Sequence, residues 1–330
     1  MRLRRGMREW ASLGAAALAA MALSSAALAQ AYPSQNITLV VAYPAGGVPD
    51  VIARILGPAL SDRLGKPVVI ENRAGASSTI GMASVARATP DGHTLLLGDT
   101  SLAVAPNVVA KLSYDAQRDL APIAPLMRSF MTLMVNPKVP AATVGELIAL
   151  AKAKPGELKY GTSGFGTPPH LGALAFIQAA GIDMLHVPYR GVALALNDVV
   201  GGHIQVVFVS QSVGASQAKG GNARVLGVYG EKRVASLPDV PTFRESGLDT
   251  QFADQGTWFG LVTTGGTPPA ILERLNVVIN QVLADPPTKG KLEAADFHLT
   301  GGSQADLAKL IADHTVHWRD AFKKAGLKPE

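Results

Sequence analysis

Short apolar runs alternate with amphipathic helical repeats along nearly the whole chain, separated by Gly, Pro and Asp turns. Residues 37–43 form a near-continuous apolar run, and the apolar positions that follow Pro49 recur at helical spacing. An apolar run at residues 68–71, a helical stretch at about residues 80–88 and an apolar run at residues 94–97 complete a β-α-β-α-β unit. This pattern is typical of an α/β fold with mostly parallel sheets flanked by helices.

A similar unit begins at residues 133–135 and continues to the apolar run at residues 225–228. About three hundred residues, nearly half of them apolar, can bury a large core and are more typical of two domains than of one. The two units in series therefore predict two lobes. The last helices, from about residue 270 onward, are expected to return to the first lobe.

The N-terminus has the pattern of a secretory signal peptide. Residues 1–8 carry four arginines, an apolar run covers residues 11–28, and Ala27-Leu28-Ala29 provides the small residues of a cleavage site. A membrane anchor is the alternative, because the run approaches the length of a span. The abundance of Ala and Ser and the cleavage site favour removal, with residues 1–29 as the signal peptide and a mature start near Gln30.

Charge and cysteine content exclude several functions for the mature chain. Removing the leader takes four arginines and one glutamate from 30 basic and 25 acidic residues, which leaves a net charge of +2. No basic stretch with interleaved aromatic residues remains, so nucleic acid is not expected as a partner. The chain has no cysteine, which excludes disulfides, thiolate metal sites and a lipid anchor on an N-terminal cysteine.

Two glycine-rich loops have the same placement in the two units. The loop of residues 42–50 and that of residues 161–170 each follow a predicted strand and open a helix. Backbone N–H groups and the positive end of a helix dipole there favour an anion, and glycine leaves the main chain open to it. An ordinary tight turn is the alternative for either loop alone. Together the loops predict a carboxylate site built from neutral donors such as Ser163 and Thr167.

The sequence also contains partial patterns of two other kinds of site, a hydrolase triad and a metal site. Ser163 lies in a stretch one residue short of a nucleophile elbow, and His170 and Asp198 would complete a triad, which gives a serine hydrolase as the enzymatic alternative. The final glycine of that motif is replaced by Phe165, so the motif fails. His314 and His317 lie three apart on a predicted helix but lack a third ligand of suitable spacing, so no metal site is expected.

Ordered motifs along the mature chain resemble those of the Bug-type extracytoplasmic receptors of tripartite tricarboxylate transporters. They are Tyr32-Pro33, Tyr43-Pro44-Ala45-Gly46-Gly47 with Asp50, Glu71-Asn72-Arg73, Pro90-Asp91-Gly92, Tyr114-Asp115, Val135-Asn136-Pro137, Ser163-Gly164 with Gly166-Thr167 and His170, His186 to Gly191, Leu237 to Thr242 and Trp258-Phe259-Gly260.

The resemblance implies a type II periplasmic-binding-protein fold, in which a two-crossing hinge joins lobe 1 (residues 31–132 plus 255–330) to lobe 2 (residues 133–254). It also implies a monomeric periplasmic receptor that has no cofactor and no catalytic activity. Such a receptor binds a small organic carboxylate and delivers it to a membrane permease. A sensor that presents the loaded receptor to a signalling partner is the alternative within the same family.

By matching position, the resemblance places the ligand among residues of both loops and one tyrosine beyond them. The expected ligand-binding residues are Tyr43, Ala45, Gly46, Gly47, Asp50, Ser163, Gly164, Phe165, Gly166, Thr167, His170 and Tyr189. The chain departs from the family pattern at Phe165, at Leu174 and at Val209-Ser210, where an Asp-Asn pair is frequent. Loss of acidic groups weakens the case for an amino-acid ligand, although Asp50 keeps it open. Phe165 is expected either to face the ligand or to pack under its loop.

Overall fold

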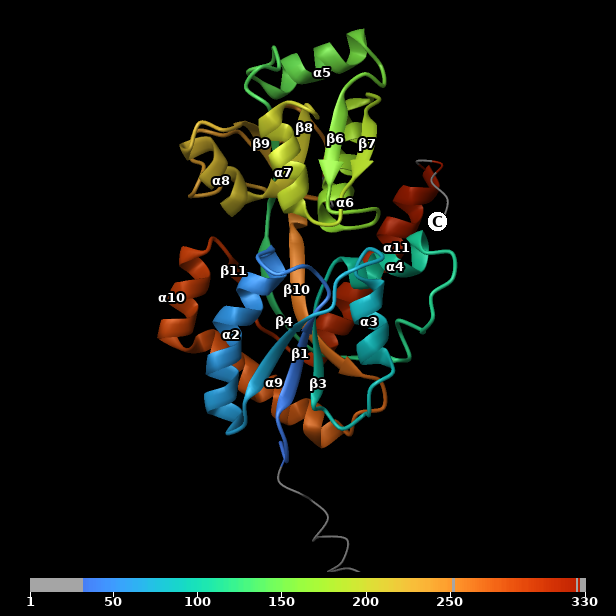
Figure 1. Ribbon diagram of the computed structural model, residues 1–330, viewed down its shortest axis with the longest axis vertical. Coiled ribbons are helices and arrows are strands. Elements are labelled where there is room, and N and C mark those ends of the chain that lie inside the picture. The colour runs from blue at the N-terminus through green and yellow to red at the C-terminus, as the bar shows by residue number, and fades with distance from the viewer. Residues whose placement is uncertain (1–31, 251–252, 325, 327–330) are drawn as a thin grey trace, which may run out of the picture.

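The structure is a computed structural model that describes residues 32–250, 253–324 and 326. The predicted signal peptide, residues 1–29, lies outside the described residues. Two separate sheets, each covered by helices, are stacked along the long axis of the molecule (Figure 1). The predicted α/β class with two lobes is therefore confirmed.

The first sheet has six strands in the order β11-β4-β10-β3-β1-β2. Its strands are β1 (Ile37–Val41), β2 (Val68–Asn72), β3 (Thr94–Asp99), β4 (Leu120–Ser129), β10 (Thr257–Thr264) and β11 (His298–Leu299).

Helices cover both faces of this sheet, which explains why β1 is apolar at every position but one. Leu39 and Val41 pack in one core with α2 (Val48–Leu64), α9 (Pro269–Ala284) and α10 (Pro286–Ala294). Val40 packs on the opposite face in a second core with α3 (Thr79–Ala86), α4 (Ser101–Val108) and α11 (Gln304–Lys324). Successive side chains of a strand point to opposite faces, so a strand covered on both sides reads as a continuous apolar run.

The second sheet has five strands in the order β7-β6-β8-β5-β9. These are β5 (Met131–Val135), β6 (Lys159–Thr162), β7 (Leu185–Pro188), β8 (Val206–Ser210) and β9 (Arg224–Val228), joined through α5 (Val144–Ala153), α6 (Pro168–Ala180), α7 (Val192–Gly201) and α8 (Gln211–Lys219). This sheet also has a core on each face, with Leu133 and Phe208 on one side and Met134 and Val207 on the other.

The sheets are mixed, whereas the sequence pattern predicted mostly parallel ones. In the first sheet β1 is parallel to β2 and β3, but β10 is antiparallel to both β3 and β4. The reason is the connection between the sheets. The chain leaves the first sheet at the end of β4, passes through Phe130 into β5, and returns at the start of β10. Since the outward and returning strands run in opposite directions side by side, they form an antiparallel ladder.

The C-terminal helices pack on the first sheet. Helices α9 and α11 both contact β4, and α11 also contacts α4. The end of α11 continues beyond the first sheet toward the second (Figure 1). There Phe322 packs with Leu171 of α6, so this helix touches elements attached to both sheets.

Candidate functional site

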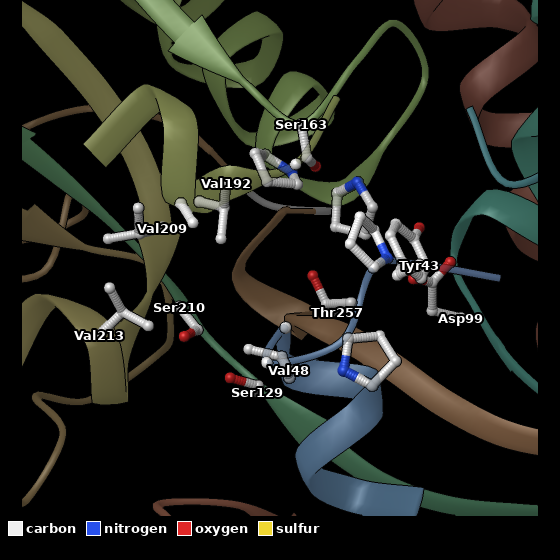
Figure 2. A pocket seen from close by; sticks show the side chains of 18 of the residues that line it. Tyr43, Val48, Asp99, Ser129, Ser163, Val192, Val209, Ser210, Val213 and Thr257 are labelled. Atoms are coloured by element: carbon white, nitrogen blue, oxygen red, sulfur yellow. The ribbon is translucent and has the colours of Figure 1, made fainter. Parts of the chain in front are cut away.

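A cavity of about 210 Å³ lies where the two sheets meet (Figure 2). Its walls combine residues of the first loop, Ser163 of the second loop, the starts of helices and the strands that connect the sheets. The lining residues are Tyr43, Pro44, Ala45, Gly46, Gly47, Val48, Pro49, Asp99, Ser129, Met131, Ser163, Pro168, Pro169, Gly191, Val192, Ala193, Val209, Ser210, Val213, Thr257 and Phe259. Gly46 and Ser163, one from each predicted loop, thus line the same cavity.

The first loop is held in shape by a carboxylate behind it. The Gly46 N–H donates to Asp50 Oδ2 at 2.9 Å, Arg54 Nε donates to the same oxygen at 2.9 Å, and Asn72 Nδ2 donates to Oδ1 at 3.0 Å. Burial would raise the pKa of Asp50, but these three hydrogen bonds together lower it. Asp50 is not among the cavity-lining residues, so its carboxylate supports the loop from behind.

A second acid, Asp99, lines the cavity beside Tyr43. The Ser101 N–H donates to Asp99 Oδ1 at 2.8 Å, and the hydroxyls of Ser101 and Tyr43 lie 2.9 Å apart. Burial raises the pKa of Asp99, although hydrogen bonds from Tyr43 and Ser101 act against the rise. Sequence reasoning missed this residue. Its signal was an acid at the carboxyl end of a buried apolar strand, at the edge where open α/β sheets bind ligands.

Ser163 of the second loop lines the cavity. The other polar groups of this loop form hydrogen bonds within the loop. Ser163 Oγ donates to Thr167 Oγ1 at 3.1 Å, and Thr167 Oγ1 donates to the Gly164 carbonyl at 2.7 Å. Gly164 and Gly166 have φ values of 122° and 72°, which only glycine adopts without strain. Of the predicted residues in this loop, Ser163 alone lines the cavity.

His170 lies behind the second loop in a stack of rings. The Gly166 N–H donates to its Nδ1 at 3.1 Å, and its ring centroid is 4.4 Å from that of His186. Burial, followed by the neighbouring His186, lowers the pKa of His170 to about 3. The ring is therefore neutral, and it fixes the loop by accepting a backbone hydrogen bond.

The triad that a serine hydrolase would need is not assembled from Ser163, His170 and Asp198. Ser163 Oγ donates to Thr167, and His170 Nδ1 accepts from the Gly166 backbone. The Asp198 carboxylate accepts from the Tyr189 hydroxyl at 2.6 Å. Each candidate member therefore has a different partner from the one that the triad requires. Tyr189 itself is directed to Asp198 and does not line the cavity.

Phe165 adopts the packing role that was one of its two predicted alternatives. Its ring centroid lies 4.7 Å from that of His170 and 5.8 Å from that of Phe322. Phe165 and Phe322 lie with Val104, Val108 and Leu174 in an apolar cluster between α4, α6 and α11. Leu174, a second departure from the family pattern, thus also packs in this cluster.

The remaining departure, Val209-Ser210, does line the cavity. The sequence marked this pair through the resemblance alone. It gave no sign that the ends of β4 and β10 would add Ser129 and Thr257, which face each other across the antiparallel ladder. Those residues come from strands on the two passes between the sheets, far apart in the chain.

Four helices begin at the cavity wall. Val48 opens α2, Pro168 opens α6, Val192 opens α7, and Ser210 is the N-cap of α8. A helix N-terminus carries unsatisfied N–H groups and a partial positive charge, so this arrangement favours an anion. Within the described ranges, the residues that line the cavity include no Lys, Arg or His.

No group of three or more His, Cys, Asp or Glu side chains in the part of the chain that the structure describes is arranged to hold a metal ion. No helix among the described residues is long and apolar enough to span a bilayer.

Comparison with known proteins identifies the family. The model of the tripartite tricarboxylate transporter family receptor matches residues 52–327. The protein BugT of Bordetella pertussis is 31% identical over 94% of this chain and 95% of its own length. Among solved structures, the periplasmic binding protein BugD is 30% identical with a TM-score of 0.84, covering 91% of this chain and all of that one.

A second solved relative, Rpa4515 of R. palustris, was determined with adipate. It is 30% identical with a TM-score of 0.85, again over 91% of this chain and all of that one. The family match covers most of the chain, and the resemblance drawn from the ordered motifs is confirmed. The chain belongs to the receptor family of the tripartite tricarboxylate transporters.

Proposed function

We propose that the mature chain is a monomeric periplasmic receptor that closes two lobes around a small organic carboxylate and delivers it, unchanged, to a tripartite membrane permease. In this proposal residues 1–29 are the signal peptide, residues 31–132 with 255–330 form lobe 1, and residues 133–254 form lobe 2. The receptor needs no cofactor and carries out no chemical step.

One observation carries the proposal: four helix N-termini meet at a cavity between the two sheets. Backbone N–H groups and hydroxyls can hold a carboxylate without a buried counter-charge. The position of the cavity supports a hinge mechanism, because its walls come from elements on both sheets and from the two strands that connect them. Closing the lobes would complete the site. The relative determined with adipate supports a carboxylate as the ligand.

The roles of the predicted residues divide into two groups in this proposal. Tyr43, Ala45, Gly46, Gly47 and Ser163 contact the ligand, because they line the cavity. The others keep the two loops in shape from behind, and these are Asp50, Gly164, Phe165, Gly166, Thr167, His170 and Tyr189.

The test is calorimetric titration of the purified mature chain with a panel of small carboxylates, combined with a variant that fills the cavity. Ala193→Trp places an indole in the cavity from the first turn of α7 and should abolish binding. Leu194→Trp adds the same group one residue later, at an exposed position outside the lining, and should bind as the wild type does.

A ligand present at a hundredfold excess over its dissociation constant should raise the free energy of unfolding by about 2.7 kcal/mol. Binding that survives in Ala193→Trp would place the site elsewhere. A panel without any bound carboxylate would overturn the proposed function.

A further inference from the structure

The cavity has two chemically different sides. Figure 2 shows Tyr43 and Asp99 on one side and Val209 and Val213 on the opposite side. Val192 lies near the latter pair. Val209 belongs to an apolar core of the second sheet, and Val192 and Val213 pack against that core. We call Val192, Val209 and Val213 the valine wall. A ligand that fills the cavity must therefore present an apolar part to the valine wall and a polar part to Asp99.

Asp99 determines which polar part fits. The side chain is 3% exposed, and its hydrogen bonds come from neutral groups, the Ser101 N–H and the hydroxyls of Ser101 and Tyr43. Among the described residues, no cationic side chain lines the cavity to balance the carboxylate. A buried carboxylate without a counter-ion is unfavourable, which agrees with the raised pKa of this group.

A simple carboxylate ligand would make this imbalance worse. Its negative charge would enter a cavity of about 210 Å³ that already contains Asp99, and two like charges in so small a space repel each other. A ligand that also carries an ammonium group avoids this cost. Its carboxylate can lie at the helix N-termini and its ammonium at Asp99, so that each charge has a partner.

We infer that the ligand is an α-amino acid with an apolar side chain, bound through its carboxylate at the two loops, its ammonium at Asp99 and its side chain at the valine wall. The inference rests on the proposed function, because it names the class of carboxylate that the receptor takes. The volume of the cavity, about 210 Å³, is large enough for such a ligand, since a cavity of about 150 Å³ admits benzene. Asp50, the acid that the sequence offered for an ammonium, is already committed to Gly46, Arg54 and Asn72.

The experiment compares L-leucine with 4-methylpentanoate, the same molecule without its amino group. Calorimetry on the wild type should show L-leucine binding at least tenfold more tightly. In Asp99→Asn the preference should shrink to less than threefold, because the partner of the ammonium has lost its charge. Asp62→Asn removes an equal charge from an exposed position of α2 and should keep the wild-type preference.

The outcomes separate this inference from the proposed function. If 4-methylpentanoate binds the wild type as tightly as L-leucine, the amino-acid inference is wrong and the carboxylate receptor stands. If L-aspartate binds more tightly than L-leucine, the valine wall does not select the side chain. If no carboxylate of the wider panel binds, the proposed function itself fails. The comparison of ligands on the wild type needs no variant, so poor folding of Asp99→Asn would not remove the test.

Discussion

Replacing Gly166 by alanine tests the contact between the second loop and the first sheet's helices. Gly166 has a φ of +72°, and a Cβ added there would lie 2.7 Å from Val108 Cγ2 and 3.3 Å from Val104 Cγ1. Both valines are buried in the cluster that holds Phe165 and Phe322, so neither can move aside freely. The left-handed backbone costs about 1 kcal/mol for alanine, and overpacking costs about 1–3 kcal/mol more.

Gly181→Ala is the matched control for this prediction. Gly181 ends the same helix that Gly166 precedes, has a φ of +60°, and has no atom within 4 Å of an added Cβ. Urea denaturation should show a loss of about 1 kcal/mol for Gly181→Ala and about 2–4 kcal/mol for Gly166→Ala. Equal losses in the two variants would refute the close contact between the loop and α4.

Three further predictions concern stability. Phe322→Ala should lower the free energy of unfolding by about 3–5 kcal/mol, because it leaves a cavity at a buried position. Val316→Ala, at an exposed position of the same helix, should change the free energy of unfolding by less than about 0.5 kcal/mol. Equal effects of the two variants in thermal denaturation would contradict this packing. Asp50→Asn should destabilise the protein above pH 3.8, and the difference should vanish as the pH falls through the lowered pKa of Asp50 in the fold; a difference that persists in acid would contradict the charge role. Because His170 is buried and neutral in the fold, the free energy of unfolding should fall as the pH is lowered from 6.5 toward 3, by up to about 1.4 kcal/mol per pH unit. This pH dependence should be weaker in a stable His170→Asn variant.

The elements that the sequence predicted best are those buried on both faces or along one stripe. Strand β1 is apolar at every position but one and helix α2 has apolar residues at helical spacing, so their existence followed from periodicity. Strand β4 was missed because Pro122 and Pro125 interrupt it. Proline cannot donate to a ladder, and both prolines pair beside irregularities in the register between β4 and β10.

The candidate site was only partly predictable for a different reason. The first loop and Ser163 could be found because glycine before a helix is a local signal. Thr257, Val192 and Val213 could not be assigned, since local sequence does not say which strand ends meet when two sheets are stacked. Phe165 was ambiguous because its partner, Phe322, lies near the other end of the chain.

Calorimetric titration with a ligand and its amide tests the central claim most directly, because the amide replaces the carboxylate by a neutral group and keeps the ammonium and the side chain. With L-leucine and L-leucinamide, the helix N-termini and Ser163 should hold the carboxylate and should give the amide at least a hundredfold weaker binding. Equal binding of the two, or stronger binding of the amide, would show that the cavity does not recognise a negative charge and would contradict the account.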